Sequence, residues 1–314
     1  MILTSLVNLA LPLLLLGLLT FVPLRGFIPL VLQALSILAV IATLAVVSIW
    51  AAWPYWLPYI YLVACVGLTA WRIATRSKQN EARPTRASWI GAAVYTLVGL
   101  WAASMLAPAL SGRSPDREVA TVQLAWPLAE GRYVIAHGGS REAINPHMKT
   151  LDTAVPRFAE WRGQSYAVDI LGYDPRFWRQ FGRGSDPADY PIWESTILSP
   201  CDGTVKVIEA GAPDMAVPQM DRSRMVGNAV LIDCGSFDVV LAHLRQGSIA
   251  VELGQQVSVG TRIGLVGNSG NSSEPHLHLH AQRSGEPGAP FGGTPLQIEF
   301  TNEFPYRNRL FVGR

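Results

Sequence analysis

The sequence carries little charge, and long stretches of it carry none. Charged residues make up 15% of the 314 residues, whereas hydrophobic residues make up 49%. Residues 1–24, 26–71 and 87–112 contain no Asp, Glu, Lys or Arg. About 20 consecutive apolar residues are enough to cross the hydrocarbon core of a bilayer. This lack of charge excludes an ordinary soluble fold for the first 110 residues and predicts a membrane region.

The uncharged stretches divide into four predicted membrane spans, near 2–22, 27–49, 56–72 and 88–109. The middle stretch is long enough for two spans, and its Trp, Tyr and Pro residues at 51–58 suit a turn at the membrane interface. No ionisable residue falls within a span, which argues against a transported ligand. We therefore expect an all-α transmembrane bundle of four helices over residues 1–110, with the lipid bilayer as its partner.

Basic residues indicate the orientation of these spans. Five of them crowd the loop between the third and fourth spans: Arg72, Arg76, Lys78, Arg83 and Arg86. Loops rich in Lys and Arg stay in the cytoplasm. Residues from 112 onward are then extracytoplasmic. The first span has no basic segment ahead of it, unlike a cleaved signal peptide.

A strongly basic surface is also missing. Six basic residues and one acidic residue precede position 111, leaving 19 basic and 22 acidic residues for the remainder. The net charge of +2 therefore averages a basic region and a slightly acidic one. This distribution argues against a nucleic-acid partner.

Cysteine is scarce, with three residues in the whole chain. Cys65 falls in the third predicted span, and Cys201 and Cys234 fall in the extracytoplasmic part. The absence of Cys-x-x-Cys spacing excludes a cysteine zinc site of that kind. Outside the cytoplasm a cysteine pair can oxidise. Cys201 and Cys234 therefore either form a disulfide or remain two buried thiols, and the sequence leaves both open.

After about residue 120 the chain becomes rich in glycine, proline and short β-prone runs. The runs are residues 133–136, 204–208, 229–233, 239–244, 248–251 and 275–280, each bounded by turn residues. This spacing predicts an all-β, mainly antiparallel domain of a barrel or sandwich type. We assign it to residues 131–314, after a linker at 111–130. Residues 171–194 are expected to form a long irregular insertion.

Histidine is the next scarce residue, and its distribution is uneven. All six histidines lie after position 130, and His276, His278 and His280 alternate with two leucines. Alternate residues of a strand share one face, so these imidazoles should lie together with the leucines in the core. Imidazole nitrogens are common zinc ligands. Taken alone, the triplet is either part of a metal site or an exposed strand with incidental histidines.

A longer pattern surrounds this triplet. Pro-His-Leu-His at 275–278 follows a glycine-rich turn at 264–270 and Ala-His-Leu at 242–244, with Ser-Pro-Cys-Asp-Gly-Thr-Val at 199–205 and Tyr-Ala-Val-Asp-Ile at 166–170. Together these motifs resemble the lysostaphin-type zinc endopeptidases of the bacterial cell wall. The resemblance covers roughly residues 165–283. It implies a periplasmic peptidase domain on the bacterial cytoplasmic (inner) membrane, with Zn²⁺ as cofactor and peptidoglycan or another peptide as substrate.

The resemblance also implies roles for individual residues. Asp169 and His278 match zinc ligands of the family, and His243 and His276 match its two catalytic, non-ligand histidines. These would assist a water molecule and stabilise the oxyanion of the tetrahedral intermediate. One position departs from the pattern: Ser165 stands four residues before Asp169, where a histidine ligand is usual. Serine is a poor zinc ligand.

A replacement ligand lies upstream. Asn145-Pro146-His147 fits a pattern of some family members, so His147 is predicted as the third ligand, with His137 and then His280 as alternatives. His280 is otherwise expected to contact substrate. Asn145 is expected to contact substrate or to brace His147.

The sequence thus predicts a membrane-anchored zinc metalloendopeptidase that hydrolyses peptide bonds in peptidoglycan cross-links or stem peptides. Ser165 favours an alternative of another class, a degenerate domain that binds cell wall or regulates a separate wall hydrolase. A protein substrate in place of peptidoglycan is a third possibility. Nothing in the sequence identifies a protein partner.

Overall fold

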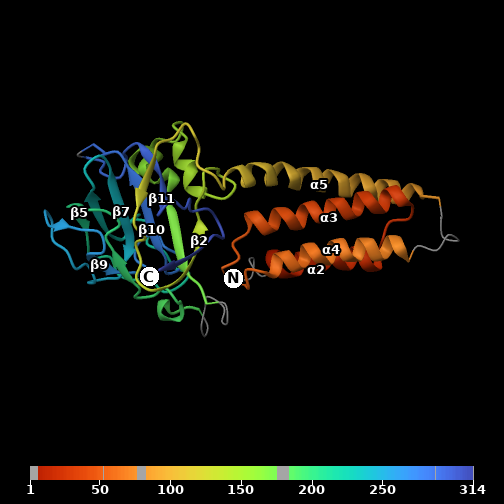
Figure 1. Cartoon of the computed structure of the whole chain (residues 1–314), viewed down its shortest axis with the longest axis horizontal. Coiled ribbons are helices and arrows are strands. Elements are labelled where there is room, and N and C mark those ends of the chain that lie inside the picture. The colour runs from red at the N-terminus through yellow and green to blue at the C-terminus, as the bar shows by residue number, and fades with distance from the viewer. Residues whose placement is uncertain (1–5, 52, 76–82, 175–183, 287, 314) are drawn as a thin grey trace. The chain divides into compact units, whose positions relative to one another are not determined.

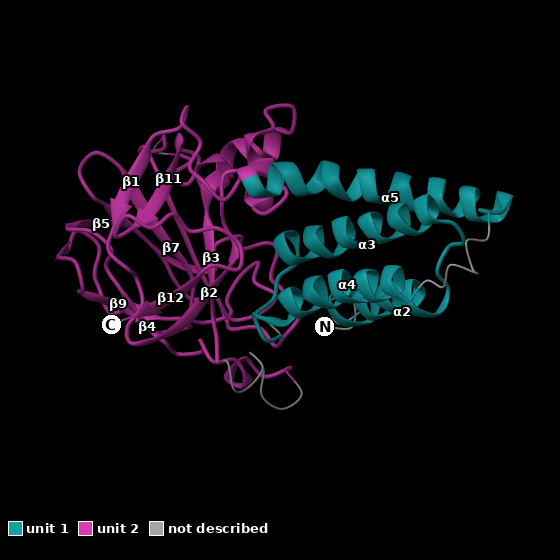
Figure 2. Cartoon of the chain, turned by 45° about the vertical axis from the view of Figure 1, so that its right-hand side comes forward, with its two compact units in different colours: residues 1–110 teal, residues 111–314 magenta. Residues whose placement is uncertain are grey.

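The computed structural model describes residues 6–51, 53–75, 83–174, 184–286 and 288–313. It divides into two compact units, residues 1–110 and 111–314 (Figure 2). Several predictions fall partly outside the described residues: the start of the first span, Arg76 and Lys78 of the basic loop, and the centre of the 171–194 insertion.

The first unit is helical (Figure 1). A π-helical turn η1 (Leu6–Ala10) leads into α2 (Leu11–Phe21), followed by α3 (Phe27–Val47), α4 (Leu57–Ala74) and α5 (Arg86–Ser111). Among the described residues, α3, α4 and α5 are long and apolar enough to cross a membrane, while the first apolar helix, Leu6–Phe21, is shorter. The structure therefore supports three candidate spans, where the sequence predicted four.

Side chains of this unit follow the pattern expected in lipid. Small residues let α3 and α5 approach, because a side chain at Gly99 would collide with Ser36. Beside this contact the hydroxyl of Thr43 donates to the carbonyl of Ala102 at 2.9 Å. Large apolar side chains such as Val63 and Leu97 are exposed. Close packing through small residues with apolar side chains outside is typical of transmembrane helices.

The second unit is a mainly antiparallel β domain, as predicted. Its main sheet has the order β12-β2-β3-β10-β7-β6-β5-β8, β11 joins β10, β1 pairs with β11 in parallel, and β4 and β9 form a separate pair. The strands are β1 (Thr121–Leu124), β2 (Gly131–His137), β3 (Val168–Gly172), β4 (Thr196–Leu198), β5 (Gly203–Glu209), β6 (Asn228–Asp233), β7 (Asp238–Leu244), β8 (Gln256–Val257), β9 (Arg262–Leu265), β10 (Leu277–Gln282), β11 (Pro295–Phe300) and β12 (Leu310–Gly313). The segment predicted as a linker, 111–130, therefore contains a strand.

The predicted β-runs match strands of this domain with one exception. The run at 248–251 is not a strand, so that prediction was wrong. There the Ser248 hydroxyl donates to the carbonyl of Arg245 and accepts from the backbone nitrogen of Leu265. A side chain thus satisfies backbone groups that a strand would pair with its neighbour.

The core explains why β10 holds its register. Leu277, Leu279 and Ala281 point into the main hydrophobic cluster and are fully buried. Because side chains alternate along a strand, His278 and His280 must face the other way.

The disulfide between Cys201 and Cys234 joins the residues that flank the paired ends of β5 and β6, resolving the alternative left open by the sequence.

Candidate active site

The sheet register alone aligns three polar side chains. His137 at the end of β2 pairs with Asp169 of β3, and Asp169 pairs with His278 of β10. Directly opposed residues of adjacent strands carry their side chains on the same face. The row His137–Asp169–His278 is therefore a consequence of strand pairing.

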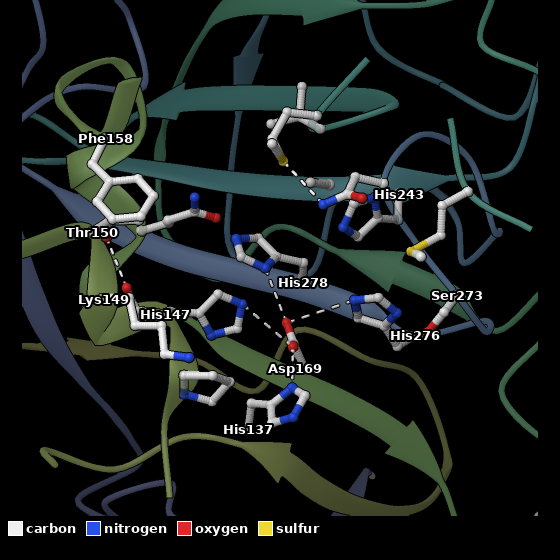
Figure 3. A pocket seen from close by; sticks show the side chains of 17 residues that line it. His137, His147, Lys149, Thr150, Phe158, Asp169, His243, Ser273, His276 and His278 are labelled. Carbon is white, nitrogen blue, oxygen red and sulfur yellow. Dashed lines mark hydrogen bonds and ion pairs between the residues drawn. The ribbon is translucent and has the colours of Figure 1, made fainter. Parts of the chain in front are cut away.

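Asp169 is the centre of a histidine cluster (Figure 3). Its Oδ1 lies 2.9 Å from Nδ1 of His278 and 3.6 Å from Nε2 of His276. Its Oδ2 lies 2.7 Å from Nδ1 of His137 and 3.4 Å from Nε2 of His147. Burial alone would raise the pKa of Asp169, but the surrounding imidazoles outweigh it and hold this pKa well below its usual value. The carboxyl group is therefore ionised.

His147 enters the cluster from a short 3-10 helix, Pro146–Leu151. Asn145 caps this helix, and its side-chain oxygen lies 3.0 Å from Nδ1 of His147. The amide nitrogen of Asn145 donates to the carbonyls of Gly139 and Ala167, so its oxygen must be the acceptor. Nδ1 of His147 therefore carries the proton, and Nε2, the nitrogen facing Asp169, is bare.

Burial also sets the charge of His147. It lowers the pKa of this imidazole to about 3, against the opposing effect of the Asp169 carboxylate. His147 is thus neutral near pH 7. A histidine must be neutral to bind a metal, so His147 is ready to act as a ligand.

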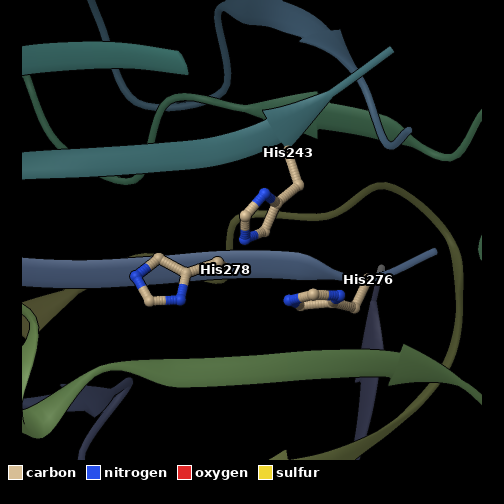
Figure 4. A group of neighbouring side chains, drawn as sticks. All are labelled: His243, His276 and His278. Carbon is tan, nitrogen blue, oxygen red and sulfur yellow. The ribbon is translucent and has the colours of Figure 1, made fainter. Parts of the chain in front are cut away.

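His243 and His276 lie on the opposite side of Asp169 from His147 (Figure 3), and Figure 4 shows these two histidines beside His278. Nδ1 of His243 donates to the carbonyl of Ser269 at 2.8 Å, and Nδ1 of His276 donates to the carbonyl of Glu274 at 2.8 Å. Each Nε2 is then bare. Burial, followed by the neighbouring His276 and His278, holds the pKa of His243 well below its usual value. Its imidazole is therefore a neutral base.

The backbone of His243 is strained. Its φ angle is +63°, in the left-handed region that residues other than glycine rarely adopt. Its backbone nitrogen is held by the carbonyl of Val226. Such conformations cost about 1–3 kcal/mol and cluster at functional sites. The left-handed backbone conformation at His243 breaks the regular alternation of side chains along β7.

The histidines open into a pocket of about 350 Å³. Its polar side holds Asp169 and His147, and an apolar side is formed by Phe158, Met220 and Met225. No sequence motif marks these apolar residues: Phe158 lies in a 3-10 helix, Pro156–Tyr166, and the two methionines lie in the segment between β5 and β6.

The remaining predicted residues lie outside this pocket. Ser165 is fully buried, and its hydroxyl donates to the carbonyl of Arg162 and pairs with Thr150. Asn145 is also fully buried, which fits bracing of His147 and not contact with substrate. His280 is 2% exposed and does not line the pocket, so its predicted contact with substrate has no support in its position.

Sequence reasoning missed Arg307. Its buried guanidinium donates from Nε to the carbonyl of Ala136 and from Nη1 to the carbonyl of Ala143. Burial lowers its pKa to about 10, opposed by Asp169, so it remains charged. Arg307 thus ties β2 to the loop that leads to Asn145. No motif surrounds it, and it lies far from both segments in sequence.

The donor atoms fall into two overlapping groups that could hold a metal ion. One group is His147, Asp169 and His278, and the other is His243, His276 and His278, with ligand atoms within 4.8 Å of one another in each. Two histidines with one carboxylate are a common protein ligand set of catalytic zinc. The first group matches this ligand set, because it combines two histidines with the carboxylate of Asp169.

Residues 188–290 match the sequence profile of Peptidase family M23. The chain carries a peptidase M23 domain. His243, His276 and His278 lie within the matched residues, whereas His147 and Asp169 lie before them. The contacts of Asp169 with His147 and His278, and not the sequence profile, therefore place these last two residues at the candidate site.

One curated relative is the peptidoglycan DD-endopeptidase ShyA of Vibrio cholerae. The two are 35% identical over 95 residues, which is 29% of this chain and 22% of the relative. The aligned region thus spans about a fifth of the length of ShyA.

Solved structures of similar proteins include a putative peptidase M23 from Pseudomonas aeruginosa, with 28% identity, coverage of 28% of this chain and 34% of that chain, and a TM-score of 0.22. The catalytic domain of lysostaphin from Staphylococcus simulans has 18% identity, coverage of 35% and 80%, and a TM-score of 0.22. A zinc-containing peptidase from Vibrio cholerae has 19% identity, coverage of 54% and 36%, and a TM-score of 0.25.

Proposed function

We propose that this protein is a membrane-anchored zinc metalloendopeptidase that hydrolyses peptide bonds in peptidoglycan, in cross-links or stem peptides. The observation that carries the proposal is the convergence of His147, Asp169 and His278 at a pocket that also holds His243 and His276. The M23 match supports a peptidase, and the likeness to ShyA supports peptidoglycan as the substrate class.

In this proposal His147, Asp169 and His278 hold the metal. Zinc, when bound at such a set, supplies Lewis-acid polarisation of the scissile carbonyl and lowers the pKa of a water molecule. Asn145 keeps Nε2 of His147 bare by accepting from Nδ1. His137 donates from Nδ1 to Oδ2 of Asp169 and so orients the carboxylate.

His243 and His276 move the protons. Each has a bare Nε2 and a tethered Nδ1–H, so each can accept a proton from the attacking water at Nε2. The protonated imidazole can then donate to the oxyanion or to the leaving amine. The apolar side of the pocket excludes water around the substrate backbone.

Cleavage of purified peptidoglycan tests this activity. The full chain in detergent should release soluble peptides, the release should stop with a chelator, and added zinc should restore it. His276→Ala should retain zinc and lose most of the release, because it removes a proton carrier and no ligand. Release that persists in the chelator or in His276→Ala would contradict the mechanism.

The helical unit supports a membrane location. We place four spans in the cytoplasmic membrane of a bacterium, with the basic loop of residues 72–86 inside and the M23 domain in the periplasm. This placement of the M23 domain is the same whether or not the short Leu6–Phe21 helix spans the bilayer, because Arg25 remains inside in both cases. Reporter fusions after residues 80 and 112 in cells should report opposite sides. The same side for both fusions would contradict this topology.

Ser165 favours a second candidate, a non-catalytic domain that binds cell wall or regulates another hydrolase. In that case the chain would sediment with peptidoglycan and release no peptides, with or without zinc. A third outcome, cleavage of exported proteins but not of peptidoglycan, would keep the chemistry and change the substrate class.

A further inference from the structure

One lysine lies at the histidine pocket. Among the described residues that line this pocket, Lys149 is the only Lys or Arg, and Asp169 is the only Asp or Glu. Asp169 is buried and faces four imidazoles, whereas the side chain of Lys149 is 63% exposed. The pocket therefore presents one solvent-accessible lysine to an incoming substrate.

The backbone that carries Lys149 is fixed close to the candidate metal ligand His147. Both residues belong to the 3-10 helix Pro146–Leu151, which Asn145 caps, and both line the pocket (Figure 3). Within this helix the hydroxyl of Thr150 donates to the carbonyl of His147 at 2.8 Å. The ammonium group of Lys149 is thus tethered near His147 by the length of one side chain.

Glu142 holds the ammonium group of Lys149 only weakly. Nζ of Lys149 lies 4.0 Å from Oε1 of Glu142, whose side chain is 61% exposed. Ion pairs between two exposed side chains contribute little to stability, because water and salt screen them. A carboxylate brought in by a substrate can therefore replace Glu142 at little cost.

The chemistry of Lys149 favours one kind of substrate group. Its ammonium carries three hydrogen-bond donors and no acceptor, so its strongest hydrogen bonds are made to anions. Peptides carry anions as carboxylates, at a chain end or on an acidic side chain. The apolar side of the pocket, formed by Phe158, Met220 and Met225, offers no donor to such a group. A substrate carboxylate is therefore attracted to the part of the pocket at Lys149.

We propose that Lys149 is a specificity residue that binds a free carboxylate of the substrate, on the His147 side of the scissile bond. This inference rests on the proposed function, in which the pocket takes peptides of peptidoglycan. It narrows the substrate class to peptides that carry a carboxylate close to the bond that is cut.

Binding of two matched ligands tests this inference. The ligands are soluble cross-linked peptides, freed from the sugar strands of purified peptidoglycan, either untreated or with their carboxyl groups converted to carboxamides. Calorimetry measures their Kd for the zinc-loaded full chain in detergent, with His276→Ala in every protein so that no ligand is consumed. Amidation should weaken binding to the parent about 5–10-fold, because hydrogen bonds between two charged groups are stronger than those to a neutral amide.

Variants at Lys149 assign this preference to one side chain. Lys149→Met should bind both ligands about as weakly as the parent binds the amidated one, while Lys149→Arg should restore most of the preference. Arg262→Met is the matched control, because Arg262 is an exposed cation of β9 that does not line the pocket. It should keep the full preference. Zinc content at saturation should be equal in all these proteins, which separates ligand recognition from damage to the metal site.

Three results would overturn the inference. The first is an unchanged preference for the untreated ligand in Lys149→Met, and the second is an equal loss of preference in Arg262→Met. The third is a parent that binds neither ligand or does not distinguish them.

Peptide release from peptidoglycan distinguishes failure of this inference from failure of the proposed function. If the natural chain and Lys149→Met release peptides with the same KM, the hydrolysis stands and only the carboxylate role fails. If the natural chain releases none, while the parent prefers the untreated ligand through Lys149, the hydrolysis fails and the recognition of a carboxylate stands.

Discussion

Asn145 and His147 form a hydrogen-bonded unit in which one side-chain oxygen holds both the backbone and the ring. This oxygen lies 3.3 Å from the backbone nitrogen of His147 and 3.0 Å from its Nδ1. The cap that starts the 3-10 helix therefore also sets the tautomer of the imidazole. A change at Asn145 should reach the metal site without removing a ligand.

Asn145→Ala should weaken zinc binding by about 10–100-fold, because Nδ1 of His147 loses its acceptor and the ring is free to turn. Chelator competition at pH 7.5 measures this loss. Wild-type affinity in a folded Asn145→Ala chain would show that the ring is held by other contacts.

The strained backbone at His243 leads to a prediction about stability. His243→Gly and His243→Ala both remove the imidazole, but only glycine adopts a φ of +63° without strain. His243→Gly should therefore be more stable than His243→Ala by about 1 kcal/mol, seen as a higher midpoint of thermal unfolding. Both should lose peptide release equally. An alanine variant as stable as the glycine variant would mean that this backbone relaxes at no cost.

The buried neutral histidines predict acid sensitivity of the metal-free chain. Burial lowers the pKa of His147, His243 and His280 below the value of about 6.5 that applies in the unfolded chain. As the pH falls below about 6.5 the unfolded state binds protons that the folded state refuses, so stability falls with pH. Each such histidine contributes up to about 1.4 kcal/mol per pH unit.

Thermal unfolding of the chelator-treated chain, followed by circular dichroism between pH 7.5 and 4.5, checks this acid sensitivity. The midpoint should be steady above about pH 7 and fall below about pH 6.5. A midpoint that stays level down to pH 4.5 would contradict the neutral state of these imidazoles.

The disulfide should stabilise the M23 domain without taking part in the site. Cys201 and Cys234 are 33 residues apart in sequence and do not line the pocket. Replacing both with alanine should lower the free energy of unfolding by about 2–4 kcal/mol. Zinc content at saturation should remain that of the natural chain. Loss of zinc in a folded double variant would show that the metal site requires the disulfide.

Part of the candidate site could be predicted from the sequence, because His278 and His280 lie in one strand, β10, in which side chains alternate. The position of His278 opposite Asp169 follows from the pairing of β10 with β3, and the sequence connected these two residues only through the family resemblance. The place of Arg307 did not follow, since it approaches from a distant segment that has no pattern. The burial of His280 was missed for a related reason. Alternation predicts on which face of the sheet a side chain lies, but the burial of that side chain depends on which segments cover this face.

Helix length could be predicted less well than helix position. The uncharged stretches located the described helices of the first unit. Uncharged residues also continue through the turns between these helices, so the stretches do not show where each helix ends. The prediction of a strand at 248–251 was wrong: the backbone nitrogen of Ala250 donates to the carbonyl of Ile263 in β9, but next to it the Ser248 hydroxyl takes the place of a strand partner for the backbone nitrogen of Leu265.

The measurement that tests the central claim most directly is the zinc content of three purified full-length proteins: the natural chain, His147→Ala and Ser165→Ala. Elemental analysis after dialysis should find about one zinc per chain in the natural protein and in Ser165→Ala, because serine is a poor zinc ligand and the buried Ser165 hydroxyl is bonded to Arg162 and Thr150. His147→Ala should retain almost none. Equal zinc in His147→Ala and the natural chain, or no zinc in either, would contradict the assignment of His147, Asp169 and His278 as the metal site.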